Sequence, residues 1–448
     1  MALLSDIAPV TINPALNLFE ITPHNVSESD AFFVEYFPIN PDFTNLHPVE
    51  FHVPASDLAY IDLAKSRIFV TLNITKGDEK LKFTSRLESD LTDPAKTSIV
   101  ALINNPLHSL FTSVELFLND QLLTSPSLNS YPYLSYLQKI LNNGNSVKNG
   151  KLTGAGFYLD TSFTDVKKNK GFLKRLELTA DTNDLELWDT LDIDAMSQFK
   201  YLINAVNVKL RLNRSSNNFA LQKATDDPTN NYKINIKSIK LVLRKIIPHE
   251  NILVAHNQLL NKHNAVYDYQ RLVFRHFNIP TGNTNFVLEN IYQGYLPSRL
   301  FCMMVDTNHF QGTLTSNPFY FKHNNLSHLS LFVDSTPLLD QKFNFTNGAK
   351  YIEAFSNLYF HSGFSAPTEG DIEITRDQFQ AGFCIFCYDS STDLSAGDYS
   401  TVNRTGNLRL SLDFAEALSG PTTLIVIGVF NNMYTINKER QVVHDFRL

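Results

Sequence analysis

Two cysteines, Cys384 and Cys387 in the stretch CIFC, have the spacing with which zinc knuckles hold a metal ion. The stretch reads as a β-strand, however, and residues three apart on a strand point to opposite faces. No second Cys-x-x-Cys pair exists, because the only other cysteine of the chain is Cys302. We therefore interpret the pair as small apolar core residues. Three cysteines in 448 residues also make no disulfide framework, which fits a reducing compartment.

Three histidines, His249, His256 and His263, recur every seven residues in a segment with helical periodicity. Seven residues make two turns of an α-helix, so these side chains lie near one another on its surface. Two turns are too far for one metal ion to bridge without a ligand from another element. The pattern favours a solvated stripe of histidines over a metal site.

Acidic side chains surround the single tryptophan, Trp188, in the stretch DLELWDTLDIDA. These acids, which could suggest carboxylate catalysis or calcium binding, are Glu186, Asp189, Asp192 and Asp194. A calcium loop needs a glycine turn and a fixed series of ligands, and the neighbouring sequence supplies neither. A solvated strand edge explains the acids more simply.

A basic run, VKKNKGFLKR, could contact phosphate or an acidic neighbour. Its cations are Lys167, Lys168, Lys170, Lys174 and Arg175. We interpret the run as an exposed loop. The whole chain carries a formal net charge of −7, which removes the usual electrostatic reason for wrapping nucleic acid. We therefore expect no specific nucleic-acid binding.

Six Asn-x-Ser/Thr triplets would be glycosylation sites in a secreted chain, and they begin at Asn25, Asn73, Asn213, Asn325, Asn344 and Asn403. The first thirty residues lack a basic start followed by an apolar run, so we expect no signal peptide and synthesis inside the cell. Since no stretch of about 18 residues is apolar throughout, we also expect no membrane insertion. The triplets are therefore interpreted as asparagine-rich turns.

Motifs that mark common enzyme families are absent from the sequence. It contains no Walker loop, no HExxH, no GxSxG and no Cys/His/Asn signature. An enzyme is not indicated, and we assign no catalytic, cofactor-binding or metal-binding residue and expect no cofactor.

The elements that position these residues are predicted from composition and periodicity. With 448 residues, 43% of them hydrophobic, the chain is long enough for two domains with large cores. Short stretches rich in Phe, Val, Ile and Thr alternate with Asn, Gly, Asp and Pro, and no βαβ alternation appears. This pattern predicts mostly antiparallel β-structure in two sandwiches of roughly eight strands each.

The chain repeats itself. LFLNDQLLT at 116–124 returns as LFVDSTPLL at 331–339, and both copies alternate with the period of two that marks a strand with one apolar face. A short helix is predicted after each copy, at 131–144 and 351–363. These landmarks keep their order at a nearly constant offset close to half the chain, which indicates an internal duplication.

Further along, the strand NVKLRLN at 207–213 returns as NLRLSLD at 407–413, which adds a third landmark to the duplication. Between the two halves, 248–263 is predicted to form a linker helix. Pro248 would open it, and Ile252, Ala255 and Leu259 would form its apolar side.

The sequence also resembles the major capsid proteins of Polinton (Maverick) elements and the related adintoviruses. The resemblance runs from about residue 31 to the end in the order of the family, and its blocks are VEFHVP (49–54), YIDLAKSRIFVTLNI (60–74), LHSLFTSVELFLNDQLLTS (107–125), YPYLSYLQKILNNG (131–144), NPFYFKHNNLSHLSLFVD (317–334), ITRDQFQAGFCIF (374–386), DLSAGD (393–398) and GNLRLSLDF (406–414). Long blocks make it more specific than a single motif would.

This resemblance implies an all-β fold of two tandem eight-stranded antiparallel jelly rolls, with short helices in loops and a linker helix. The expected division is an N-terminal arm at 1–30, a first jelly roll at 31–247, a linker helix at 248–266 and a second jelly roll at 267–448. It further implies homotrimeric, pseudo-hexameric capsomers that tile an icosahedral shell around double-stranded DNA in the virion. A single jelly-roll penton protein would occupy the vertices.

Three other readings fit parts of the sequence. Minor capsid or vertex proteins are normally single jelly rolls, whereas this chain has landmarks for two. A tandem carbohydrate-binding protein would use exposed aromatic residues on loops, and Trp188 alone gives that reading little support. An enzyme on a cupin-like jelly roll would need a His/His/acid cluster, and no close-spaced His-x-His starts one.

Overall fold

The structure is a computed structural model. It describes residues 13–16, 18–19, 21, 24–43, 46–77, 79–80, 99–179, 184–225, 227, 230–346, 350–362, 372–392, 394 and 401–444. Much of the arm expected at 1–30 and most of the block at 393–398 therefore lie outside the described residues. Among those residues, no helix combines the length and apolarity needed to span a membrane.

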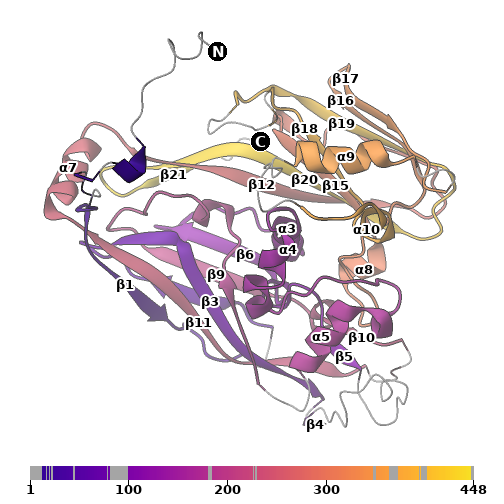
Figure 1. Cartoon of the computed structure of the whole chain (residues 1–448), viewed down its shortest axis with the longest axis horizontal. Helices are drawn as coiled ribbons and strands as arrows, with labels where there is room; N and C mark the ends of the chain where they lie inside the picture. The colour runs from indigo at the N-terminus through magenta and orange to yellow at the C-terminus, as the bar shows by residue number, and fades with distance from the viewer. Residues whose placement is uncertain are drawn as a thin grey trace.

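The first half of the chain folds into two facing antiparallel sheets (Figure 1). In one sheet β1 pairs with β11, β11 with β3, and β3 with both β4 and β8; the bounds are β1 (Glu28–Tyr36), β11 (Tyr232–Pro248), β3 (Tyr60–Lys76), β4 (Glu79–Lys80) and β8 (Leu185–Thr190). The other sheet has the order β2 (Val49–Val53), β9 (Val208–Arg214), β6 (Phe111–Leu118) and β7 (Gln121–Leu122). A separate pair joins β5 (Val100–Leu102) to β10 (Leu221–Lys223).

The second half repeats this arrangement. One sheet has the order β12 (Ala265–Ile279), β20 (Thr422–Ile436), β15 (Arg299–Asp306) and β18 (Ile385–Asp389), with β21 (Val442–His444) beside β20. The other has the order β13 (Asn285–Leu288), β19 (Thr405–Phe414), β16 (Leu326–Val333) and β17 (Thr336–Lys342), with β14 (Gln293–Tyr295) beside β19. In the described residues, the first half therefore has a five-stranded and a four-stranded main sheet, and the second half has two five-stranded sheets in a matching strand order. This arrangement confirms the predicted double jelly roll.

The repeated sequence occupies the same place in both jelly rolls. Leu116 on β6 lies opposite Leu210 on β9, and Leu331 on β16 lies opposite Leu410 on β19. Three of these four leucines are 1% exposed and Leu116 is fully buried, so each pair belongs to the core of its own sandwich. The duplication inferred from sequence thus preserves strand order and cross-strand register.

A tight hairpin explains why polar residues interrupt the apolar pattern in each copy of the repeat. Between β6 and β7 the chain turns at Asn119 and Asp120, whose φ angles are 45° and 66°, and between β16 and β17 it turns at Asp334, with φ 52°. Positive φ is costly for most residues and least so for Gly, Asn and Asp.

Replacing Asp120 by glycine is expected to stabilise the chain by about 0.5–1 kcal/mol, because glycine adopts positive φ without a steric cost. Thermal unfolding of the variant beside the parent chain would measure this. Replacing the same residue by valine, which resists positive φ, should lower the melting temperature. Equal melting temperatures for both variants would contradict the assignment of the turn.

Short helices fill the same connection in both jelly rolls. Those between β7 and β8 include α3 (Ser130–Leu141), α4 (Asn145–Lys148), η3 (Lys151–Ala155), η4 (Val166–Lys168) and α5 (Lys170–Leu178). Those between β17 and β18 include α9 (Ile352–His361) and α10 (Arg376–Ala381). The described residues also form η1 (Pro14–Leu16), α2 (Pro106–Ser109), η6 (Asp194–Met196), α6 (Asn217–Ala220), α7 (Glu250–Leu260) and α8 (Thr307–Gln311). Both helices predicted after the repeat are thus present as α3 and α9.

The predicted linker helix is α7, at the end of the molecule where β11 gives way to β12 (Figure 1). Pro248 does not open it, because Pro248 is the last residue of β11. His249 caps the helix instead, with its ring Nδ1 accepting a hydrogen bond from the backbone N–H of Asn251 at 3.3 Å. An acceptor at this position satisfies one of the free N–H groups of the first turn.

The apolar side predicted for α7 is wrong. Leu259 is 55% exposed and Ala255 is exposed, whereas Leu253 and Leu260 pack against the core of the first jelly roll. The helix carries apolar residues around much of its circumference, so its periodicity alone did not decide which side meets the body.

Candidate functional site

The junction between the two jelly rolls is formed largely by α3, a helix of the first half that lies between them (Figure 1). Its residues Tyr133 and Tyr136 are buried in the core of the second half. The Tyr136 ring stacks on Phe319 with centroids 4.0 Å apart, and the Tyr133 hydroxyl donates to the Pro318 carbonyl at 3.0 Å. The helix therefore fixes one jelly roll against the other.

A buried ionic cluster holds α3 on its other side. Lys139 Nζ lies 2.7 Å from Asp189 and 3.2 Å from Asp192. His108 Nε2 lies 3.2 Å from the same Asp189 carboxylate, and its Nδ1 is hydrogen-bonded to the Tyr131 hydroxyl at 2.8 Å. The prediction that these acids form a solvated strand edge is wrong for Asp189, which is 2% exposed.

The charges in this cluster stabilise one another. Burial alone raises the pKa of Asp189, but hydrogen bonds and charge from His108 and Lys139 outweigh it and bring the pKa well below its usual value. Burial lowers the pKa of Lys139, and the two carboxylates more than reverse that effect. Asp189 and Lys139 therefore remain a buried ion pair at neutral pH, which suits a structural joint.

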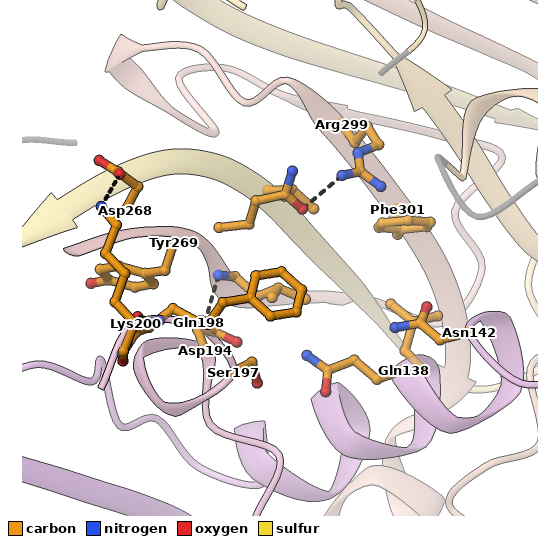
Figure 2. Close-up of a pocket in the computed structure, with 15 residues that line it drawn as sticks. Gln138, Asn142, Asp194, Ser197, Gln198, Lys200, Asp268, Tyr269, Arg299 and Phe301 are labelled. Carbon is orange, nitrogen blue, oxygen red and sulfur yellow. Dashed lines mark hydrogen bonds and ion pairs between the residues drawn. The ribbon is translucent and has the colours of Figure 1, made fainter. Parts of the chain in front are cut away.

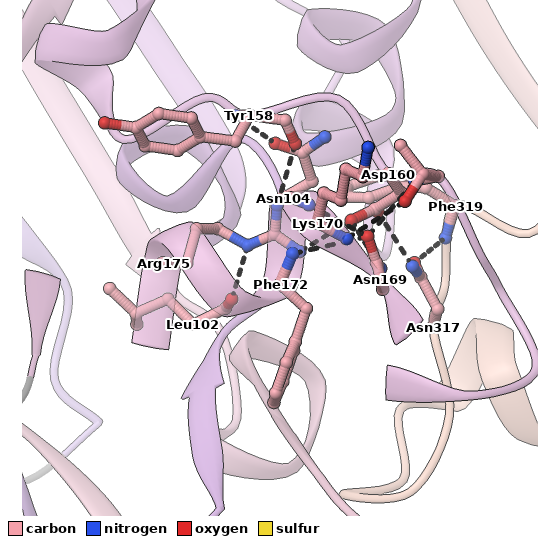
Figure 3. Close-up of polar contacts among 12 residues, drawn as sticks. Leu102, Asn104, Tyr158, Asp160, Asn169, Lys170, Phe172, Arg175, Asn317 and Phe319 are labelled. Carbon is pink, nitrogen blue, oxygen red and sulfur yellow. Dashed lines mark hydrogen bonds and ion pairs between the residues drawn. The ribbon is translucent and has the colours of Figure 1, made fainter. Parts of the chain in front are cut away.

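A second buried network connects the basic run to both halves of the chain (Figure 3). Arg175 on α5, 1% exposed, donates from Nε to the Leu102 carbonyl at 2.9 Å, from Nη1 to the Tyr158 carbonyl at 2.8 Å and from Nη2 to Asp160 at 2.7 Å. Asp160 also accepts a hydrogen bond from Asn317 Nδ2 at 2.9 Å, and Asn317 belongs to the second half. The guanidinium therefore organises a contact between the jelly rolls.

The exposed loop predicted for the basic run is wrong in two respects. The run forms η4 and α5, and Arg175 lies inside the protein. Lys168, Lys170 and Lys174 are exposed as predicted, and Lys167 is half-buried. Arg175 shares a helix face with the buried Phe172 and Leu176, which is why it points inward.

A groove of about 520 Å³ opens between α3, the segment around η6 and the strands β12 and β15 (Figure 2). The apolar residues that line it include Leu137, Phe301 and Val429. Gln138 on α3 and Asn142, the residue that follows this helix, bring side-chain amides to one wall (Figure 2). The groove thus combines apolar surface with polar groups able to hydrogen-bond a peptide backbone.

Asp194 lies in the wall of this groove and joins the two halves. Its carboxylate accepts a hydrogen bond from the backbone N–H of Leu272 on β12 at 2.8 Å. Burial raises its pKa to about 7, although that hydrogen bond and the nearby Arg271 both act to lower it and Asp192 adds to the rise. This carboxyl therefore changes charge near neutral pH, and it is not on the solvated edge that the sequence predicted.

The histidines and cysteines considered as candidates in the sequence do not belong to these buried networks. His249 and His263 are exposed as predicted, but His256 is half-buried and hydrogen-bonded to the Tyr60 hydroxyl at 2.9 Å, so the solvated stripe is only partly right. Cys384 and Cys387 are buried core residues, as predicted, and burial raises the pKa of both thiols. In the described part of the chain, no three His, Cys, Asp or Glu side chains gather as a metal site.

The asparagine triplets are not all in turns. Asn73 lies in β3 and Asn213 in β9, where its side chain donates to Glu115 at 2.7 Å. Asn325 does lie at a turn, with φ 49°. Trp188 is half-buried on β8 and stacks with Phe69 at 6.3 Å between centroids, so it is not an exposed aromatic on a loop.

Comparisons with known proteins cover nearly the whole chain. No protein-family model matches it. A protein of Caenorhabditis elegans, "Uncharacterized protein F54H12.2", is 24% identical over 404 residues, which are 89% of this chain and 93% of that protein. Among solved structures, the Sputnik virophage chain has a TM-score of 0.63 at 14% identity and matches 98% of this chain and 93% of its own.

Two further solved structures give the same architecture. The mavirus major capsid protein has a TM-score of 0.55 at 12% identity, over 98% of this chain and 96% of its own. The Faustovirus major capsid protein has a TM-score of 0.55 at 9% identity, over 96% and 93%. The chain has the double jelly-roll fold of viral major capsid proteins. The likeness extends over both halves of the chain, because each match covers nearly its full length.

Proposed function

We propose that this chain is a major capsid protein that assembles as homotrimeric, pseudo-hexameric capsomers. The observation that carries the proposal is the double jelly roll itself, which matches capsid proteins over nearly the whole of both chains. Three copies of a two-roll chain place six similar units around one axis, and such hexagonal tiles can cover the facets of an icosahedral shell. The cyclic trimer needs one heterologous interface used three times.

The junction supports this role because a tile must be rigid. Buried aromatic stacking on α3, the Lys139 cluster and the Arg175 network all fix one jelly roll against the other. We take the shell to enclose double-stranded DNA, which a chain of net charge −7 would surround without gripping its phosphates. We assign no catalytic role to any residue, and single jelly-roll penton proteins would fill the vertices of the virion.

The quoted blocks support a finer assignment to the Polinton and adintovirus lineage. Within the chain, we propose an arm at 1–30, jelly rolls at 31–247 and 267–448, and the linker at 248–266.

The solution mass of the purified chain tests the capsomer. Size-exclusion chromatography with light scattering is expected to give three times the 50.8 kDa chain mass, and negative-stain images of that peak should show hexagonal outlines. A monomer at every protein concentration and salt concentration would contradict the proposal and favour a tandem binding protein instead.

A further inference from the structure

The N-terminal segment carries apolar side chains that remain uncovered. Leu16, Leu18, Phe19 and Ile21 are 70–96% exposed. Four large apolar side chains within six residues are costly to leave in water, because removing apolar surface from water is favourable. Their cover must come from outside their present surroundings.

The groove between the jelly rolls is equally uncovered. Phe199, one of its lining residues, is 99% exposed, and the lining also includes the apolar residues Leu137 and Phe301. Gln138 and Asn142 present amide groups along one wall, and such groups pair well with the N–H and C=O groups of an extended peptide. The groove therefore suits a short extended segment with several apolar side chains.

The segment and the groove lie at the same end of the molecule. The N-terminal segment joins the body at Ser27, whose carbonyl accepts from the His249 N–H at 2.9 Å. The next residue, Glu28, accepts from the Tyr201 hydroxyl at 2.9 Å, and Tyr201 directly follows the groove residue Lys200. From Ser27 back to Ile21 the chain can span about 20 Å when extended, enough to cross to an adjacent molecule.

We propose that residues 16–21 of one copy dock into the groove between the two jelly rolls of a neighbouring copy. The neighbour is a second copy because the segment and the groove of one chain leave each other uncovered, although their attachment points are adjacent. The proposal rests on the proposed function, since copies packed side by side in capsomers would present their grooves to one another's N-terminal segments. Docking would bury Phe19 against Phe199 and the other apolar residues that line the groove.

Disulfide capture between two different chains tests the proposal. A tagged chain carrying Phe19→Cys is co-expressed with an untagged chain carrying Phe199→Cys and then mildly oxidised. Both positions are almost fully exposed, so neither change should disturb folding, and the three native cysteines are at most 4% exposed. A covalent product of about twice the 50.8 kDa chain mass, containing both chains, is expected.

The matched control pairs Phe19→Cys with Phe37→Cys. Phe37 is also an exposed phenylalanine, but it lies beyond the opposite end of β1 from Glu28. The Phe199 pairing should give at least five times more covalent product than this control. Equal yields would overturn the docking. A single chain that carries both Phe19→Cys and Phe199→Cys and forms an internal disulfide as a monomer would also overturn it, because that result places the segment in its own groove.

The light-scattering mass of the parent chain separates this inference from the capsomer. If the parent is trimeric and the Phe199 pairing yields no covalent product, the docking is wrong and the capsomer stands. If the parent is monomeric, the capsomer itself fails.

Discussion

Replacing Arg175 by methionine is expected to lower the free energy of unfolding by about 3–5 kcal/mol, the usual cost of leaving one member of a buried ion pair alone. The substitution removes three hydrogen bonds and leaves the Asp160 carboxylate inside the protein without its guanidinium partner. Denaturant unfolding followed by the fluorescence of Trp188, the single tryptophan, would measure the loss.

Lys174 provides the control for Arg175 on the same helix. Its ammonium forms an exposed pair with Glu177 at 3.0 Å, and exposed pairs contribute only about 0–1 kcal/mol. Lys174→Met should therefore leave stability nearly unchanged. Arg175→Lys should fall between the two, because one ammonium keeps the charge but cannot reach three acceptors in the fork geometry of a guanidinium. Equal losses at both positions would contradict the buried network.

Replacing Asp194 by asparagine is expected to stabilise the protein at pH 8 by about 2 kcal/mol. The pKa of Asp194 rises from 3.8 to about 7 in the folded protein. The protonated form of this carboxyl therefore favours folding. Stability linked to this group is fully present below about pH 4 and is lost as the pH rises towards 7. If the whole pKa shift of Asp194 is converted to free energy, it corresponds to about 4 kcal/mol of stability. Screening by water at the groove wall reduces this value by roughly half.

Asparagine can still accept the Leu272 hydrogen bond, and it carries no charge at any pH. Unfolding measured from pH 4 to pH 8 should therefore show parent and variant close together at pH 4 and separated at pH 8. Asp268→Asn is the control, because Asp268 lines the same groove but is 63% exposed in its pair with Lys200. Parallel curves for Asp194→Asn and the parent would rule out ionisation of this carboxyl as the cause.

Part of what sequence reasoning missed was visible in the local pattern. On β8, Asp189 follows Leu185 and Leu187 at intervals of two, so it continues their buried face. On α5, Arg175 lies three residues after Phe172 and shares its buried face. In both cases the periodicity of the surrounding residues predicts the burial, whereas the charge of the side chain predicts exposure.

The partners of those side chains could not be read from the sequence. His108 precedes its partner Asp189 by 81 positions, and Asn317 follows its partner Asp160 by 157. The groove likewise joins α3 to strands of the other half. Nothing local in these segments specifies which of them meet.

The sequence by itself determined the strands, the helices after each repeat and the duplication of the jelly roll, because alternation, turn residues and helical periodicity act over a few residues. Only the tertiary structure decided the burial partners of Asp189 and Arg175, the raised pKa of Asp194 and the side of α7 that meets the body. Those outcomes depend on the packing of segments far apart in the chain, where desolvation and hydrogen bonding between distant groups set the energy.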